Sequence, residues 1–116
     1  MFKYRKSICE PERYNYYYTK DNIRLECELR LFKYNVLRVY FSLYKVYDEN
    51  RPEDINITNS EINEYMIIVD DFMNMLNEHL VIDEPYDKII VCPYGDTAIN
   101  KIVKNKYNLE YSYEYE

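Results

Sequence analysis

Residues 58–80 read TNSEINEYMIIVDDFMNMLNEHL, and this stretch decides the fold. Its apolar side chains recur every three or four positions, which is the spacing of a helix with one buried stripe. Thr58 followed by Glu61 fits a capping box, in which the hydroxyl accepts a backbone N–H bond while the carboxylate reaches back. The stretch therefore predicts a long amphipathic helix that packs on a sheet. The apolar stripe comprises Ile62, Tyr65, Met66, Val69, Phe72, Met73, Leu76 and Leu80.

Three β-prone segments precede this helix. Residues 13–19 are dense in tyrosine, a residue that favours strands. Residues 23–32 alternate between apolar and charged side chains, so this segment has one dry face and one wet face. Residues 36–47 place apolar side chains at 37, 39, 41 and 43 on one side and Arg38, Tyr40, Ser42 and Tyr44 on the other. Asp and Asn at 20–22 and Asn at 34–35 suit tight turns. An antiparallel meander of three strands is expected.

The remaining segments complete one domain. Residues 48–57 are predicted to form a loop, and the apolar run at 88–92 is typical of a strand buried on both faces. A short helix is expected from 96 or 97 to about 104, capped by Asp or Thr, and residues 109–116 alternate like a last strand. Residues 1–12 are interpreted as an irregular basic leader. The predicted fold is a single α+β domain with a mixed, mainly antiparallel sheet (β-β-β-α-β-α-β) and two helices packed on one face.

Composition limits the class of protein. The chain has 116 residues, of which 47% are apolar, so it can bury a core as one domain. It lacks a run of about 18 apolar residues and an apolar segment behind its basic start, so no membrane span and no secretory signal are expected. Three cysteines, an odd number, favour reduced thiols and a cytoplasmic location. Abundant Ile, Asn, Lys and Tyr beside a single Gly favour a viral, phage or low-GC bacterial origin.

Charge is distributed unevenly along the chain. The segment between Arg51 and Lys88 contains ten acidic residues and no Lys or Arg. Residues 1–51 contain eleven basic and seven acidic residues, and residues 88–116 contain four of each, which reproduces the net charge of −6. The excess acid therefore belongs to the predicted helix and its flanking loops, whereas the strands are mildly basic.

A charged outer face is common on surface helices, but such faces usually mix signs to gain i,i+4 pairs. We therefore expect this face to bind a protein partner with a basic surface, in the host cytoplasm if the protein is viral. It would occupy a site for nucleic acid as a DNA-mimic-like, anti-defence inhibitor does. The predicted partner-binding residues are Glu61, Glu64, Asp70, Asp71, Glu78, Asp83 and Glu84.

Sequence motifs for chemistry are weak. Cys92 ends an apolar strand, where cysteine usually serves as a small core hydrophobe, and no histidine is placed beside it by spacing. His79, the only histidine, is expected to cap the last carbonyls of the long helix. A single Gly cannot build a phosphate-binding loop, and no paired Cys or His spacing suggests zinc. The sequence predicts no catalytic residue, no metal site and no cofactor, and an enzyme is the less favoured class.

The tyrosines leave a further interpretation open. Tyr40 with Tyr44, or the three tyrosines at 14, 16 and 18, could form an exposed ladder across strands. Such a ladder could join copies of the chain in a homodimer or larger structural oligomer. With Arg24, Arg30 and Arg38 nearby, it could instead stack single-stranded bases, although the acidic net charge argues against direct nucleic-acid binding.

The order of meander, long helix, apolar strand, short helix and strand over residues 13–116 resembles the core of acetyltransferases of the GNAT class. That family binds the coenzyme A pyrophosphate with an Arg/Gln-x-x-Gly-x-Gly/Ala turn before its long helix. Here residues 53–60 read EDINITNS, which has no Gly and carries two acids. The resemblance implies an acyltransferase-like fold with a degenerate cofactor turn and a ligand site at the strand-turn-helix of residues 89–97.

Overall fold

The predicted long helix forms α1 (Asn59–Asn77) in a computed structural model that describes residues 3–6, 13–46, 52–54, 59–92 and 98–111. Side chains at 3–6, 45–46, 52–54 and 59–61 lie outside that description. The apolar stripe faces inward as predicted, from Ile62 to Leu76, because residues spaced by three and four share one side of a helix. The helix ends three residues earlier than expected, and Leu80 is exposed.

The antiparallel meander is present. It consists of β2 (Arg13–Lys20), β3 (Ile23–Phe32) and β4 (Val36–Val46), which pair in sequence order. Asp21 and Asn22 both adopt positive φ, 51° and 66°, in the two-residue turn between β2 and β3. A type I′ hairpin needs this geometry, and Asp and Asn tolerate it better than other residues with a side chain.

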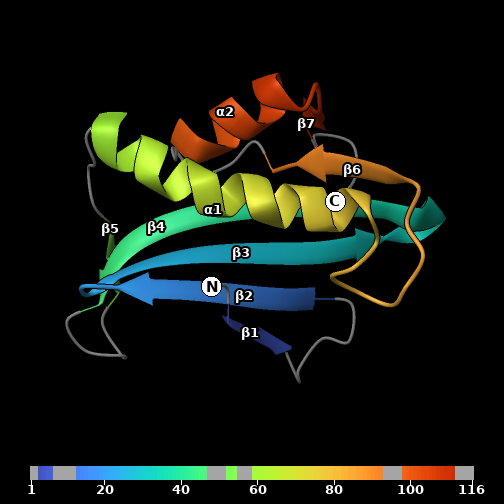
Figure 1. Cartoon of the computed structure of the whole chain (residues 1–116). Coiled ribbons are helices and arrows are strands. Elements are labelled where there is room, and N and C mark those ends of the chain that lie inside the picture. Colours follow the sequence, from blue (N-terminus) through green and yellow to red (C-terminus); the bar gives the residue numbers. More distant parts are fainter. Residues whose placement is uncertain (1–2, 7–12, 47–51, 55–58, 93–97, 112–116) are drawn as a thin grey trace.

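The second half of the chain extends the sheet with parallel strands. β6 (Lys88–Val91) pairs with β4, and β7 (Glu110–Tyr111) pairs with β6. α1 makes the first crossover and α2 (Ala98–Lys106) makes the second. Both crossovers step in the same direction across the sheet, so connections of the usual right hand place both helices on one face. The predicted α+β fold, with a mixed and mainly antiparallel sheet, is confirmed (Figure 1).

Two short strands were not predicted. The leader at 1–12 was expected to be irregular, but Lys3–Lys6 form β1, which pairs with β2. The expected loop at 48–57 contains β5, Pro52–Asp54, which pairs with β4. Strand edges offer free backbone N–H and C=O groups, and these groups recruit a neighbouring segment whatever its apolar pattern. Periodicity therefore gave no signal for either strand.

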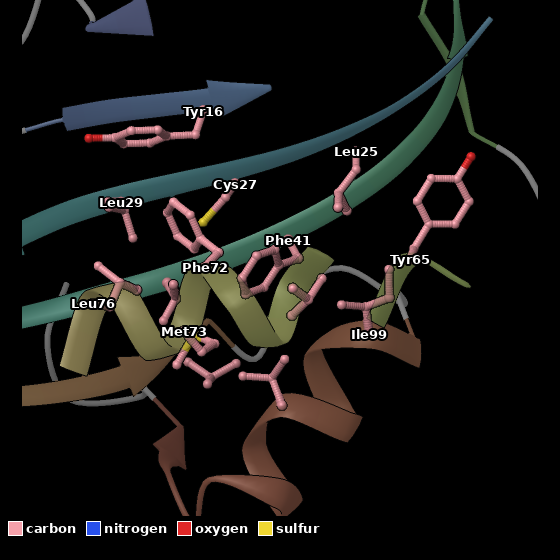
Figure 2. Close-up of a cluster of buried hydrophobic side chains, with 14 of the residues drawn as sticks. Tyr16, Leu25, Cys27, Leu29, Phe41, Tyr65, Phe72, Met73, Leu76 and Ile99 are labelled. Atoms are coloured by element: carbon pink, nitrogen blue, oxygen red, sulfur yellow. The ribbon is translucent and has the colours of Figure 1, made fainter. Parts of the chain in front are cut away.

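One core lies between the sheet and the helices (Figure 2). Alternate residues of the meander point into it, including Leu25, Cys27 and Leu29. Phe72 of α1 is central, with its ring centroid 5.2 Å from that of Tyr16 and 6.0 Å from that of Phe41 in an edge-to-face contact. Aromatic contacts of this kind add about 0.5–1.5 kcal/mol beyond area burial.

The two faces of the sheet divide the tyrosines. Tyr14 and Tyr16 are buried in the helix-facing core and Tyr18 packs against it, so the suggestion that these three form an exposed ladder is wrong. The two-residue spacing of Tyr14, Tyr16 and Tyr18 placed them on one face of the strand but did not say which face the helices cover. Tyr17, Tyr40 and Tyr44 lie on the opposite face, where their cross-strand partners are polar or charged.

Candidate functional site

The outer side of α1 carries a line of three acids. Glu64, Asp71 and Glu78 follow one another at seven-residue spacing, which is close to two helical turns, and all three are exposed. The apolar stripe fixes this orientation, because it turns the opposite side of the helix to water. The structure thus brings together three of the seven predicted partner-binding residues on one strip, which we call the α1 outer face.

Apolar side chains interleave with these acids. Ile67 is 67% exposed and Met75 is 45% exposed, and both lie between acids on the α1 outer face. Leu80, just beyond the helix, is 64% exposed. Isolated exposed apolar residues are ordinary, but apolar side chains set among charges resemble the mixed composition of transient protein interfaces.

Two of the predicted acids have cations supplied by other elements. The Lys20 Nζ lies 2.8 Å from a Glu64 carboxylate oxygen, and this bond raises the pKa of Lys20. The Lys106 Nζ lies 2.6 Å from Asp70 Oδ2, and the Tyr107 hydroxyl donates to Asp70 Oδ1 at 2.6 Å. Burial, followed by this contact with Asp70, raises the pKa of Tyr107. Glu64 and Asp70 are therefore partly neutralised within the molecule.

The other predicted residues differ among themselves. Among the described residues, no cation lies within ion-pair distance of Asp71, Glu78 or Asp83, and all three are exposed. Glu84 is half-buried beside Tyr14, whose pKa is raised first by burial and then by a hydrogen bond with Glu84. Glu61 belongs to α1, but its side chain lies outside the described part of the chain.

The end of α1 is closed by backbone groups. The His79 N–H donates to the Leu76 carbonyl at 3.1 Å and the Leu80 N–H donates to the Met75 carbonyl at 2.9 Å, which is a Schellman motif with His79 at φ 57°. The His79 ring stacks on Tyr86, with centroids 4.3 Å apart. The capping expected from the His79 side chain is therefore made by its backbone.

Among the residues that the structure describes, no reactive group stands out. Cys92 and Cys27 are buried free thiols, and burial raises the pKa of Cys27 well above its usual value. Residues 93–97, the centre of the suggested ligand site at 89–97, lie outside the described residues. Among the residues that are described, no three His, Cys, Asp or Glu side chains gather closely enough to hold a metal ion. No described helix has the length and hydropathy to cross a membrane.

Asn100 of α2 is a buried polar residue that sequence reasoning missed. Its side-chain amide accepts from the Phe41 N–H and donates to the Phe41 carbonyl, both at 2.8 Å. These two backbone groups point away from β3, toward the side on which β6 lies. The pairing of β4 with β6 runs from Val36 to Val39 and ends before Phe41; the Val39 carbonyl accepts a hydrogen bond from the Cys92 N–H. The Asn100 amide thus takes the place of a neighbouring strand, and Phe41 offers neither group to a ligand.

Comparisons with protein-family models, curated protein sequences and solved structures find no match to this chain. Function is therefore inferred from the surface.

Proposed function

We propose that the protein is a small interaction protein that binds a basic protein partner through the α1 outer face and Asp83, which lies in the connection after α1. The observation that carries this proposal is that Asp71, Glu78 and Asp83 are exposed and have no cation within ion-pair distance among the described residues. Unneutralised carboxylates on a rigid helix attract a partner of opposite charge and fix its orientation.

The exposed Ile67 and Met75 add to this proposal. Charge alone steers a partner, whereas affinity comes mainly from side chains that are removed from water at the centre of an interface. Two apolar side chains between acids supply such a centre, and Arg or Lys side chains of the partner would lie around it. A surface that binds nucleic-acid phosphates has this cationic chemistry, so the partner class remains a nucleic-acid-handling protein and the effect remains inhibition.

Glu64 and Asp70 are expected to contribute less to partner binding than the sequence suggested, because each is paired with a lysine of this chain. Each would have to exchange an internal lysine for a partner's cation, which gains little. The proposed contact residues are therefore Asp71, Glu78 and Asp83, with Met75 between the first two and Ile67 about one turn before Asp71.

The test is capture of proteins from a host lysate at low salt by the wild type and by the charge-reversed variant Asp71→Lys/Glu78→Lys. The control is Asp87→Lys/Glu110→Lys, which changes the charge equally but lies off the α1 outer face. We expect the control to retain the partner and the reversed variant to lose it. Added duplex DNA should compete for the captured partner. Equal capture by both variants, or capture that DNA does not affect, would refute the proposal.

A further inference from the structure

The sheet face that lies opposite the helices carries a row of arginines. Arg13, Arg30 and Arg38 are direct cross-strand neighbours on β2, β3 and β4. Each arginine is next in sequence to a core residue, namely Tyr14, Leu29 or Val39, and successive residues of a strand point to opposite faces. The three arginine side chains therefore share the face that the helices do not cover. Like charges directly opposite one another destabilise a sheet, which makes this row unusual.

The row is only partly neutralised. Arg13 lies 3.4 Å from Glu28 on the same face. The guanidinium carbons of Arg30 and Arg38 each lie 5.3 Å from the ring centroid of Phe32, and no carboxylate of the described residues is within ion-pair distance of either. The Phe32 ring therefore positions two guanidinium groups. The ring contacts their flat faces and accepts no conventional hydrogen bond, so the N–H groups in the guanidinium plane can still bind an anion.

The acids of this face are already engaged. Glu28 pairs with Arg13, and Glu26 accepts a hydrogen bond from the Tyr44 hydroxyl at 2.6 Å. Arg24 adds a further cation, with its guanidinium carbon 5.3 Å from the Tyr17 ring centroid. The described arginines therefore outnumber the acids on this face, whereas the acidic excess lies on α1 and the loop that follows it. The net charge of −6 conceals two surfaces of opposite sign.

We propose that this face of β2, β3 and β4 binds single-stranded nucleic acid, with Arg30 and Arg38 holding backbone phosphates. Arginine binds phosphate through two parallel N–H bonds, which suits a pair of cations held side by side. Tyr40 lies two residues from Arg38 on the same face of β4, where its ring can support a base. Arg30, Arg38 and Tyr40 are each partly exposed on this face, which suits contact with a single strand whose bases can be splayed out.

The test is fluorescence anisotropy with labelled oligothymidylate and oligouridylate of about 20 nucleotides, at roughly 50 mM salt. We expect Arg30→Gln/Arg38→Gln to bind at least about tenfold more weakly than the wild type. The log–log salt dependence should become shallower by about 1.4, since each phosphate contact on a single strand contributes about 0.7. The control Lys101→Gln/Lys104→Gln removes the same charge from α2 and should bind like the wild type.

A measurement on the wild type does not depend on how the variants fold. Photocrosslinking to a bromouridine oligonucleotide should modify residues 30–40, which hold both arginines and Tyr40. Failure of the wild type to bind either oligonucleotide, or crosslinks confined to α1 and α2, would overturn the proposal. Self-association at the same salt that Arg30→Gln/Arg38→Gln abolishes, without oligonucleotide binding, would assign the face to a second copy and overturn it as well.

Discussion

Asn100 shows how one residue can take the place of a strand. It is 2% exposed, and its amide satisfies both the N–H and the C=O of Phe41, a residue at the centre of the core. An amide is the side chain that can donate and accept at once in this geometry. Buried backbone groups without a partner are costly, so we infer that Asn100 allows β4 to separate from β6 beyond Val39.

Replacing Asn100 with Leu should destabilise the fold. Leucine has the same number and branching of non-hydrogen atoms but leaves the Phe41 N–H and C=O unpaired, at a cost of about 1–3 kcal/mol for each group. Urea denaturation measures the change in the free energy of unfolding. The control Asn105→Ala changes an exposed amide of the same helix and should stay within about 0.5 kcal/mol of the wild type. A leucine variant as stable as the wild type would contradict the role of Asn100.

At the scale of elements, α1 buries its apolar stripe but has an electrostatically unfavourable C-terminal end. No basic residue lies in its last turn, and Glu78 adjoins the negative end of the helix dipole. Natural sequences usually place Lys or Arg there. An acid in place of a base at this exposed helix end costs some stability, and such a departure is expected where the surface is selected for binding.

Glu78→Lys should therefore stabilise the isolated protein while weakening partner capture. The lysine interacts favourably with the helix dipole, and the expected gain is about 0.3–1 kcal/mol at low salt. Urea denaturation at low and high salt checks it, because screening should reduce the gain. A destabilised variant would mean that Glu78 supports the fold, and loss of capture could then not be attributed to the α1 outer face.

The hydrogen bond from Tyr107, the residue after α2, to Asp70 of α1 should make stability depend on pH above about 10. The pKa of Tyr107 is raised from its ordinary value of 10.0, so the folded state keeps a proton that the unfolded state loses. The contribution is present below pH 10 and is lost as pH rises. Tyr107→Phe should lower stability at neutral pH by about 0.5–1.5 kcal/mol through the lost bond to Asp70. It should also make the alkaline decline less steep, and the remainder comes from other tyrosines with a raised pKa, such as Tyr14. Unfolding free energies measured between pH 8 and pH 11 test both effects.

At the scale of the whole molecule, the sequence predicted what depends on local pattern. The spacing of the α1 stripe and the alternation in β3 and β4 fixed the main elements and their buried sides. The ion pairs could not be predicted from local pattern, because Lys20 is 44 residues from Glu64 and Lys106 is 36 residues from Asp70 in the sequence. A charge map along the chain could not show that these two acids have partners.

The arginine row was hidden for the same reason. Arg24, Arg30 and Arg38 were visible in sequence, but the cross-strand neighbours of Arg30 are set by strand register. Register also placed Arg13, which pattern alone did not single out, in the same row. Surfaces built from several strands are therefore predicted less well than a surface built on one helix, where spacing alone gives the side.

The central claim is that an acidic, partly apolar side of α1 contacts a basic protein. Carbodiimide labelling of carboxylates, read by mass spectrometry with and without the captured partner, tests it most directly. We predict that the partner protects Asp71 and Glu78 from labelling, while Glu110 at the sheet edge reacts equally in both states. Labelling of Asp71 and Glu78 that the partner leaves unchanged would contradict the claim.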